Sequence, residues 1–527
     1  MSVWKDTSEE RDKGWLLGPW YSDDELRREF GEHFVISRRF GIVQGPKTRP
    51  IDDYSESQVN ATISAQEKVE LQTVDDMVAV IKCALQAILP DRTVCIQLAN
   101  GTFMRGRLPE GVGKADAKCW LGKCFDLKSA YRQIPTKPDE AWATCMGVWD
   151  PVLGKPAYFR QLALPFGAVG SVYGFNRLSR AIWAAGSSYL RLAWCNYYDD
   201  YPSAELKAHA TVADLAVRAF FPLLGWTLAT EEAKCKPYFS SFVMLGCSLQ
   251  LDKCPKDIIT VGNKPERIEE ISGLLCKCVT ERKCSQPVAA TIGGKCQFAS
   301  GQVYGRLTLG LLHVLSVFQH RSLSGWLDDG VFETMASLNM CLLKLQPRTI
   351  DLNGPINPIL SFTDGAVEGL MSWTVTVGGV VLDTVDERAV MFGERLPLAL
   401  VRHWRLDGNV QTIGQAELLP VLLAKLWLGE RARHRRIFYF IDNDSARQAL
   451  VKGYSNSRAS SEILNLIAEV DVAVQSWSWY ARVPTDSNPG DGQSRLRLLS
   501  APENLNAILV PTPDLPDKLI RACDEES

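Results

Sequence analysis

Two adjacent carboxylates, Asp199 and Asp200, close the stretch Asn-Tyr-Tyr-Asp-Asp at residues 196–200. An apolar run at 189–194 precedes them, and the pattern predicts a strand, a tight turn and a second strand that hold both acids at an exposed hairpin tip. Adjacent acids repel each other, and a bound cation is the simplest way to keep both ionised at neutral pH. Asp-Asp pairs are also common in solvated turns, so the pair indicates a site only if a third carboxylate and a nucleotide pocket accompany it.

The bulk composition is that of an ordinary globular protein. The chain has 527 residues, 46% apolar and 23% charged, which gives room for about three or four domains. No apolar run approaches the length of a membrane span, and the polar start predicts no secretory signal. Fifteen cysteines lie scattered without a paired framework, which favours reduced thiols in an intracellular compartment, cytoplasm or nucleus.

The charge is unevenly distributed along the chain. A net charge of −3 is unfavourable for a protein that binds nucleic acid. Residues 100–160, however, contain ten Lys+Arg against six Asp+Glu, and residues 253–298 contain eight against five. Acidic catalytic clusters elsewhere can cancel such basic patches in the total, so the net charge does not exclude nucleic-acid partners.

A third acid, Asp126, lies 73 residues before Asp199, at the end of an apolar strand. If that strand neighbours the 196–200 hairpin, Asp126 and Asp199 converge and can bridge two divalent ions, the arrangement that stabilises an in-line phosphoryl transfer. The backbone carbonyl of Leu127 is then placed to join the coordination. Taken alone, Asp126 is equally well explained as the N-cap of a following helix.

Two further segments lie in order along the same region. Leu-Pro-Phe-Gly at 164–167 opens a turn that runs into a helix expected at 173–185, and such a turn lets a substrate approach the backbone. Lys234 lies in a basic turn that leads to an apolar strand at 242–246. A plain loop and a solvated lysine explain each piece separately.

In their order and spacing these segments resemble the successive motifs of a retroelement reverse transcriptase, over residues 31–250. The motifs are Phe-Asp-Leu-x-x-Ala-Tyr (125–131), Leu-Pro-Phe-Gly (164–167), Tyr-x-Asp-Asp (197–200), the lysine turn (232–236) and Leu-Gly (245–246). Upstream, residues 47–54 resemble the fingers strand that contacts the incoming triphosphate.

The resemblance implies a role for each matching residue. Asp126, Asp199 and Asp200 would bind the metal ions, Asp200 less directly. Lys47 and Arg49 would neutralise the triphosphate.

Other matching residues surround the nucleotide. Phe166 and Gly167 would pack against it, Tyr197 would lie near the primer end, and Lys234 would protonate the leaving pyrophosphate as general acid. Tyr131 takes the place of the bulky gate that collides with a ribose 2′-hydroxyl, which favours deoxynucleotides. Two alternatives remain: an RNA-dependent RNA polymerase, and a decayed or domesticated copy that only binds nucleic acid.

A second set of four acids lies beyond residue 350. They are reached from a strand, a helix, a strand and a short helix, an order in which they could gather around two metal ions and hydrolyse a phosphodiester. Glu417 is the most informative, because an acid within an apolar helical face is avoided unless it has a partner. The others could be caps or solvated acids. The four are Asp364, Glu417, Asp442 and Asp491.

This order resembles ribonuclease H, whose four carboxylates these acids match. The closing Asn-Pro-Gly-Asp-Gly-x-Ser-Arg pattern at 488–495 is similar to tyrosine-recombinase (DIRS-like) retrotransposons and to some pararetroviruses. The catalytic histidine that the family carries before the fourth acid has no counterpart, because no histidine follows His434.

The fold class implied by both resemblances is an α+β right-hand polymerase (fingers, palm, thumb) followed by an α/β ribonuclease H-like domain. The expected partners are an RNA template, a DNA primer, the RNA–DNA hybrid and deoxynucleoside triphosphates. Other parts of a polyprotein are also expected as partners, whereas a membrane is not. Mg²⁺ or Mn²⁺ would serve as cofactor, two ions at each site. The expected segments are 1–30 (lead-in), 31–250 (fingers and palm), 251–350 (thumb and connection), 351–500 (ribonuclease H-like) and 501–527 (tail).

Overall fold

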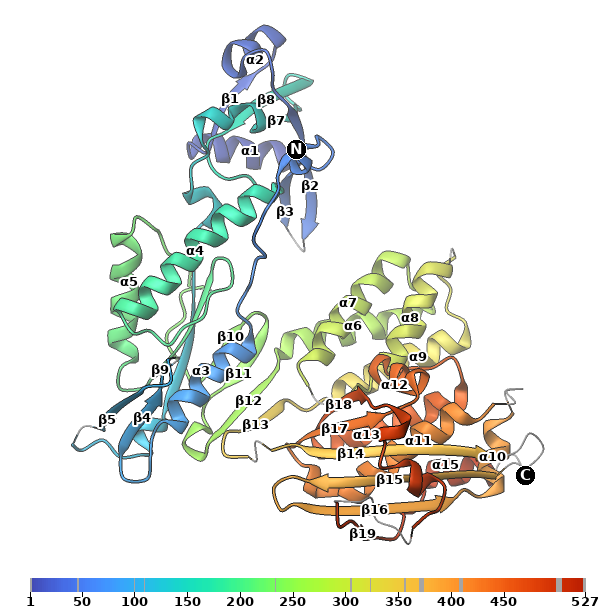
Figure 1. The fold of residues 1–527 in the computed structure, drawn as a ribbon. Coiled ribbons are helices and arrows are strands. Elements are labelled where there is room, and N and C mark those ends of the chain that lie inside the picture. The colour runs from blue at the N-terminus through green and yellow to red at the C-terminus, as the bar shows by residue number, and fades with distance from the viewer. Residues whose placement is uncertain are drawn as a thin grey trace. The chain divides into compact units, whose positions relative to one another are not determined.

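The computed structural model describes residues 2–524 apart from 45–46, 99, 109, 233, 304–305, 323, 355–356, 369–373, 407–410 and 499–504. The chain divides into two compact units, Met1–Leu245 and Gly246–Ser527 (Figure 1). Both units mix helices and strands. The division lies close to the boundary expected at 250, and the second unit joins the segments expected as thumb and as ribonuclease H-like domain.

The first unit contains a five-stranded sheet in the order β1-β8-β7-β2-β3. The β2–β7 pair is parallel and the other neighbours are antiparallel. Helix α1 (Ser2–Asp12) contacts this sheet, and a capping box at Ser22 starts α2 (Asp23–Phe30). The strands are β1 (Leu16–Trp20), β2 (Ile36–Gln44), β3 (Lys47–Asp53), β7 (Cys145–Asp150) and β8 (Lys155–Gln161).

The segment expected as a lead-in at 1–30 contributes strand β1 to this sheet. Leu16 pairs with Gln161 of β8 and is buried, and Leu26 and Phe30 of α2 are also buried. These three apolar side chains enter the core, whereas the neighbouring Leu17 is exposed.

An antiparallel pair of strands, β6 (Trp120–Asp126) and β9 (Asp200–Leu206), forms the second part of this unit. Aromatic side chains fill the core around it, among them Phe125, Phe175 and Trp194. The helix expected at 173–185 is confirmed, because α4 includes this range. The helices are α3 (Val74–Gln86), α4 (Val169–Tyr189) and α5 (Ala210–Leu223), and the remaining strands are β4 (Thr93–Gln97), β5 (Phe103–Arg107) and β10 (Ser241–Met244).

The second unit begins with three antiparallel strands and a group of four helices. The helices pack around a core that includes Ile271, Leu275 and Met335. Helix α7 continues through Gly293 and Gly294. The elements are β11 (Cys247–Gln250), β12 (Ile258–Asn263), β13 (Arg348–Asp351), α6 (Pro265–Glu281), α7 (Gln286–Gly301), α8 (Leu309–Arg321) and α9 (Asp329–Lys344).

A six-stranded sheet in the order β18-β17-β14-β15-β16-β19 forms the rest of the second unit. Strands β14, β17 and β18 run parallel to one another, and β15 is antiparallel to β14 and β16. Helix α11 packs against β14 and β15 (Figure 1). Its residues 415–425 are all buried. The strands are β14 (Ile359–Glu368), β15 (Thr374–Asp383), β16 (Arg388–Arg395), β17 (Arg436–Ile441), β18 (Trp477–Arg482) and β19 (Ile508–Leu509).

The segment expected as a tail at 501–527 contributes to this sheet. Strand β19 pairs in parallel with β16, at Val390↔Ile508 and Met391↔Leu509. Leu519 in the last helix is buried. The helices of this part are α10 (Leu398–Trp404), α11 (Ile413–Leu428), α12 (Asp444–Lys452), α13 (Arg458–Val474), α14 (Asp491–Ser494) and α15 (Asp517–Asp524).

Across the residues that the structure describes, none of the helices has the length and apolar character needed to cross a membrane.

Candidate active sites

The first three predicted acids meet at one end of the β6–β9 pair. Asp126, the last residue of β6, is directly opposite Asp200, the first residue of β9. The amide of Leu127 donates to the carbonyl of Asp199 at 3.3 Å, so the two chain segments continue side by side past the strand ends. Register thus brings together acids that are 73 or more residues apart in the sequence.

A tight turn presents the acid pair. Tyr197 and Asp200 exchange backbone hydrogen bonds of 2.9 and 3.0 Å, and Tyr198 has φ +52°. The Tyr198 carbonyl accepts from the Asn196 amide at 3.0 Å and from the Ser179 hydroxyl of α4. The buried side chains of Asn196 and Ser179 therefore hold the backbone of the turn in place. Its acids are half-buried rather than at an exposed tip, and an irregular segment with isolated bridges precedes it in place of the expected strand.

The acids influence one another's ionisation. Burial raises the pKa of Asp200 to about 6, and the charges of Asp199 and Asp126 contribute to the rise. Burial also raises the pKa of Asp199, as does Asp126, whereas Lys234 and Arg49 lower it. The nearby positive charge does not offset the repulsion among three ionised carboxylates, and a bound cation would offset it.

Lys234 lies directly at this group. Its Nζ is 2.5 Å from Oδ2 of Asp126. Burial lowers the pKa of Lys234, but the hydrogen bond and charge of Asp126 more than offset this, so the pKa is raised. The other oxygen, Oδ1 of Asp126, is buried and has no hydrogen-bond partner in the described part of the chain. That orphaned oxygen, beside two further carboxylates, fits the ligand set of a hard divalent ion.

The rings of Tyr131 and Phe166, which were both predicted to lie near the nucleotide, are neighbours. The Tyr131 ring stacks on Phe175 with centroids 4.6 Å apart and lies 5.2 Å from the ring of Phe166. Phe166 is 44% exposed, so one side of it is open to a ligand.

Gly167 is held tightly beside this pocket. It has φ +100°, and an added Cβ would lie 2.2 Å from the backbone oxygen of Asp52, so only glycine fits. Asn60 accepts from the amide of Val169 at 2.8 Å and donates to the Gly167 carbonyl at 3.0 Å, fixing the turn to the neighbouring segment.

The remaining predicted residues of this site have mixed positions. Arg49 is exposed on β3, and its charge acts on Asp199. Lys47 begins β3, but its side chain lies outside the described residues. Leu127 is buried, and Tyr197 is half-buried with its ring 5.3 Å from that of Tyr198.

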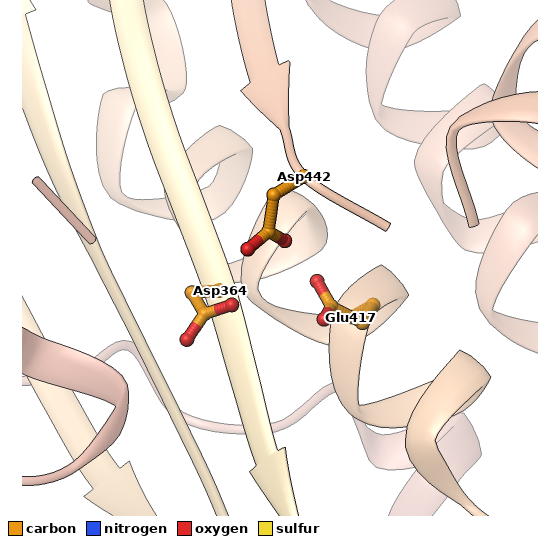
Figure 2. A group of neighbouring side chains, drawn as sticks. All are labelled: Asp364, Glu417 and Asp442. Carbon is orange, nitrogen blue, oxygen red and sulfur yellow. The ribbon is translucent and has the colours of Figure 1, made fainter. Parts of the chain in front are cut away.

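A second acid group lies in the six-stranded sheet. Asp364 lies in β14, Glu417 in α11, and Asp442 directly after β17, and Figure 2 shows their carboxylates turned toward one another. One ligand oxygen from each lies within 4.8 Å of those of the other two. Gly365 allows this approach, because an added Cβ there would lie 2.3 Å from the backbone oxygen of Ala416.

Burial dominates the electrostatics of this group. It raises the pKa of Glu417 to about 9, and the charges of Asp364 and Asp442 add to the rise. Burial also raises the pKa of Asp364 to about 6, although the Ser494 hydroxyl, which donates to its Oδ2, lowers it. Oε2 of Glu417 and Oδ1 of Asp442 are buried without a partner among the described residues. The donor set again fits a hard divalent cation.

The fourth predicted acid, Asp491, is not a member of this compact group. Its Oδ1 accepts two hydrogen bonds of 3.0 Å from the Arg495 guanidinium. Its charge still contributes to the raised pKa of Asp364. Asp491 therefore lies near the group but is compensated by its own cation.

Two residues at these sites were absent from the sequence prediction. Ser494 donates to Asp364, and Cys124, two residues before Asp126 on β6, acts to lower the pKa of Asp200. Alternation along β6 places Cys124 on the face of Asp126, a signal available from the sequence. No local signal links Ser494 to a residue 130 positions away.

No protein-family model matches the sequence, and no curated protein matches it. Solved structures of foamy viral protease-reverse transcriptases match this chain at low sequence identity. The one in complex with an RNA/DNA hybrid is 12% identical, with a TM-score of 0.46 over 98% of this chain and 55% of that chain. One in complex with double-stranded DNA is 11% identical, with a TM-score of 0.45 over 92% of this chain and 82% of that chain. A related "dRH" structure with double-stranded DNA is 11% identical, with a TM-score of 0.44 over 92% and 69%.

Proposed function

We propose that this chain is an RNA-directed DNA polymerase of a retroelement that also cleaves the RNA strand of an RNA–DNA hybrid. The observation that carries the proposal is the register of β6 and β9, which brings Asp126 opposite Asp200 beside the turn that holds Asp199. Lys234 and Arg49 supply positive charge next to these acids. The retroelement origin, of the DIRS-like or pararetrovirus type, is part of the same proposal.

The acids are the groups that would hold the metal ions. Asp126, Asp199 and Asp200 would hold two Mg²⁺ or Mn²⁺ ions in the first unit, and the orphaned oxygen of Asp126 is a ready ligand. When bound, such ions stabilise the charge on the attacking and leaving oxygens of a phosphoryl transfer.

The other residues would position the substrate. Arg49 would bind the triphosphate through its fork of donors, and Phe166 would pack against the nucleotide. Lys234, kept protonated by Asp126, would hold a proton at Nζ for the leaving pyrophosphate. The Tyr131 ring, which stacks on Phe175 and lies beside Phe166, would exclude a 2′-hydroxyl.

The second unit would supply the nuclease. Asp364, Glu417 and Asp442 would hold two divalent ions against the scissile phosphate of the RNA strand, with Asp491 in support. DNA synthesis would require an RNA template, a DNA primer and deoxynucleoside triphosphates, whereas cleavage would require only the RNA–DNA hybrid.

Primer extension on an RNA template, with deoxy- and ribonucleotides side by side, tests the proposal. Asp199→Asn should reduce DNA synthesis by roughly 10³-fold or more and leave hybrid cleavage intact, whereas Asp442→Asn should do the reverse. Asp139→Asn and Asp329→Asn, at exposed positions, are the controls.

Each alternative has its own outcome. Equal use of ribonucleotides by the wild-type chain, unchanged when Tyr131 is replaced by Val, would indicate an RNA polymerase. Binding of the hybrid without either activity would indicate a protein that only binds nucleic acid. Loss of neither activity in the Asp199 and Asp442 variants would refute the site assignments.

A further inference from the structure

A closed ring of hydrogen-bonded side chains lies in the first unit beside the candidate nucleotide pocket. Arg39 donates to both oxygens of Asp52, at 2.8 and 3.1 Å, and to Glu10 at 2.8 Å. Gln161 donates to Asp52 at 2.6 Å and accepts from Arg132 at 2.7 Å. Arg132 completes the ring by donating to both oxygens of Glu10, at 2.8 and 2.9 Å.

The ring members come from five separate elements: α1, β2, β3, β8 and the short helix η3 (Ala130–Gln133). Its side chains are almost fully enclosed, with 0% exposure for Arg39, 1% for Asp52, 3% for Arg132 and 13% for Glu10. Two arginines balance two carboxylates. Removing one partner from such a buried network leaves the others with uncompensated charge, so each member depends on the rest.

The ring touches the candidate nucleotide pocket at two points. Arg132 directly follows Tyr131, and its guanidinium carbon lies 5.6 Å from the centroid of the Phe166 ring. Asp52 is the residue whose backbone oxygen lies against Gly167. Ring members thus lie against both Phe166 and Gly167 of the Leu-Pro-Phe-Gly turn.

We propose that Glu10 is a positioning residue for nucleotide selection, acting through Arg132 on the two aromatic side chains Tyr131 and Phe166. The inference rests on the proposed polymerase function. Glu10 is the acceptor that holds one end of the Arg132 guanidinium, while Gln161 holds the other. Together they fix the plane of the guanidinium over Phe166, and they fix the backbone on which Tyr131 is carried. The N-terminal helix α1 thereby becomes part of the mechanism that selects the sugar.

Glu10→Gln is the direct test, because it keeps the size of the side chain and removes its charge. We expect KM for deoxynucleotides to rise by roughly 3- to 10-fold, kcat to change less than twofold, and discrimination against ribonucleotides to fall by a similar factor. Glu9→Gln is the matched control, since Glu9 is exposed on the same helix and its carboxylate lies 4.0 Å from Nζ of exposed Lys13.

A second variant separates positioning from stability. Arg132→Lys keeps a positive charge but loses the planar fork that binds Glu10 and Gln161 together, so it should reproduce the change in KM. Glu10→Asp, which keeps the charge, should restore part of the discrimination. A merely structural role would lower the melting temperature of Glu10→Gln while leaving KM and discrimination of the folded protein at wild-type values, and that result would overturn the inference.

A measurement independent of catalysis distinguishes this inference from the proposed function. Hydrogen–deuterium exchange of peptides covering residues 128–134 and 163–169 should be faster in Glu10→Gln than in Glu9→Gln. Equal exchange in the two variants would refute the positioning role. If the wild-type chain incorporates no nucleotide while Glu10→Gln still exchanges faster than Glu9→Gln, the polymerase proposal is refuted. The coupling between the ring and the pocket then remains in place.

Discussion

The two acid groups of this chain differ in how their negative charge is compensated. In the first unit, Lys234 pairs with Asp126, and Lys234 and Arg49 both lower the pKa of Asp199. In the second unit, burial and two neighbouring carboxylates act on Glu417, and all three raise its pKa. The candidate polymerase site thus carries part of its positive charge within the protein, whereas Glu417 keeps its proton at neutral pH unless a cation from solution binds.

This difference predicts a difference in response to pH and to divalent ions. A group of carboxylates must lose its protons before it binds a metal ion, so metal affinity falls when their pKa values rise. With the pKa of Glu417 raised to about 9 and that of Asp200 to about 6, the nuclease group gives up its last proton at higher pH. We therefore expect nuclease activity to require more alkaline conditions or more Mg²⁺ than DNA synthesis does.

Glu417→Gln should have the largest effect on this contrast. The loss of one acid from a compact group of three should reduce hybrid cleavage by on the order of 10³-fold and leave primer extension unchanged. Glu333→Gln, at an exposed position on α9, is the control. If cleavage survives at more than a tenth of the wild-type rate, Glu417 is not a ligand.

In the absence of Mg²⁺, the same variant should be more stable than the wild type. Folded Glu417 holds a proton that the unfolded chain releases above its ordinary pKa of 4.5, so the free energy of unfolding falls as pH rises from about 4.5 to about 9. Gln cannot ionise, and the variant should exceed the wild type by on the order of 3 kcal/mol at pH 8 in EDTA. Chemical denaturation of both proteins at pH 5 and pH 8 measures this difference. The same difference in the free energy of unfolding between variant and wild type at both pH values would contradict the raised pKa.

The sequence predicts these acids because each has a recognisable local setting. Asp126 and Asp442 follow apolar strands, Asp364 lies beside a glycine in a strand, and Glu417 interrupts the apolar face of a helix. The hydrophobic pattern predicts these strands and the helix, although it does not fix which strands pair. Lys234 and Arg49 were predicted beside the nucleotide, but their effect on the pKa of Asp199 was not.

Contacts between distant segments account for what the sequence did not predict. Strand β1 pairs with β8 and β19 pairs with β16, so both ends of the chain belong to sheets whose partner strands lie more than 100 residues away. At Gly293-Gly294, α7 continues because Ile292 and Cys296 are fully buried in the helical core. Tertiary burial there outweighs the weak helix propensity of two glycines.

Lys234→Ala should have an intermediate effect, because it makes the polymerase acids resemble the nuclease acids. Lys234 lowers the pKa of Asp199 and Asp200, so both should rise in the variant and the acid limb of the pH–rate profile should move to higher pH. We expect DNA synthesis at pH 7.5 to fall by roughly 10- to 100-fold, which includes the loss of a general acid.

Two further variants resolve these contributions. Lys234→Arg keeps the charge and should restore the acid limb, although not the full rate, because a guanidinium is a poor proton donor. Lys236→Ala, at an exposed position two residues away, should leave the profile unchanged. An acid limb that does not move in Lys234→Ala would show that this lysine does not compensate the acid group.

Asp491→Asn should have the smallest effect, and it tests whether the nuclease group has three members or four. Asp491 is paired with Arg495, and its charge raises the pKa of Asp364. The Asn variant loses a supporting ligand but lowers the pKa of Asp364, so these two consequences oppose each other. We expect hybrid cleavage to fall by about 3- to 10-fold at pH 8. The loss should be smaller at pH 6, where easier ionisation of Asp364 matters more. Cleavage rates at both pH values, titrated with Mg²⁺, measure this. A loss as large as that of Asp442→Asn at both pH values would make Asp491 a direct metal ligand, and the nuclease group would then have four carboxylates.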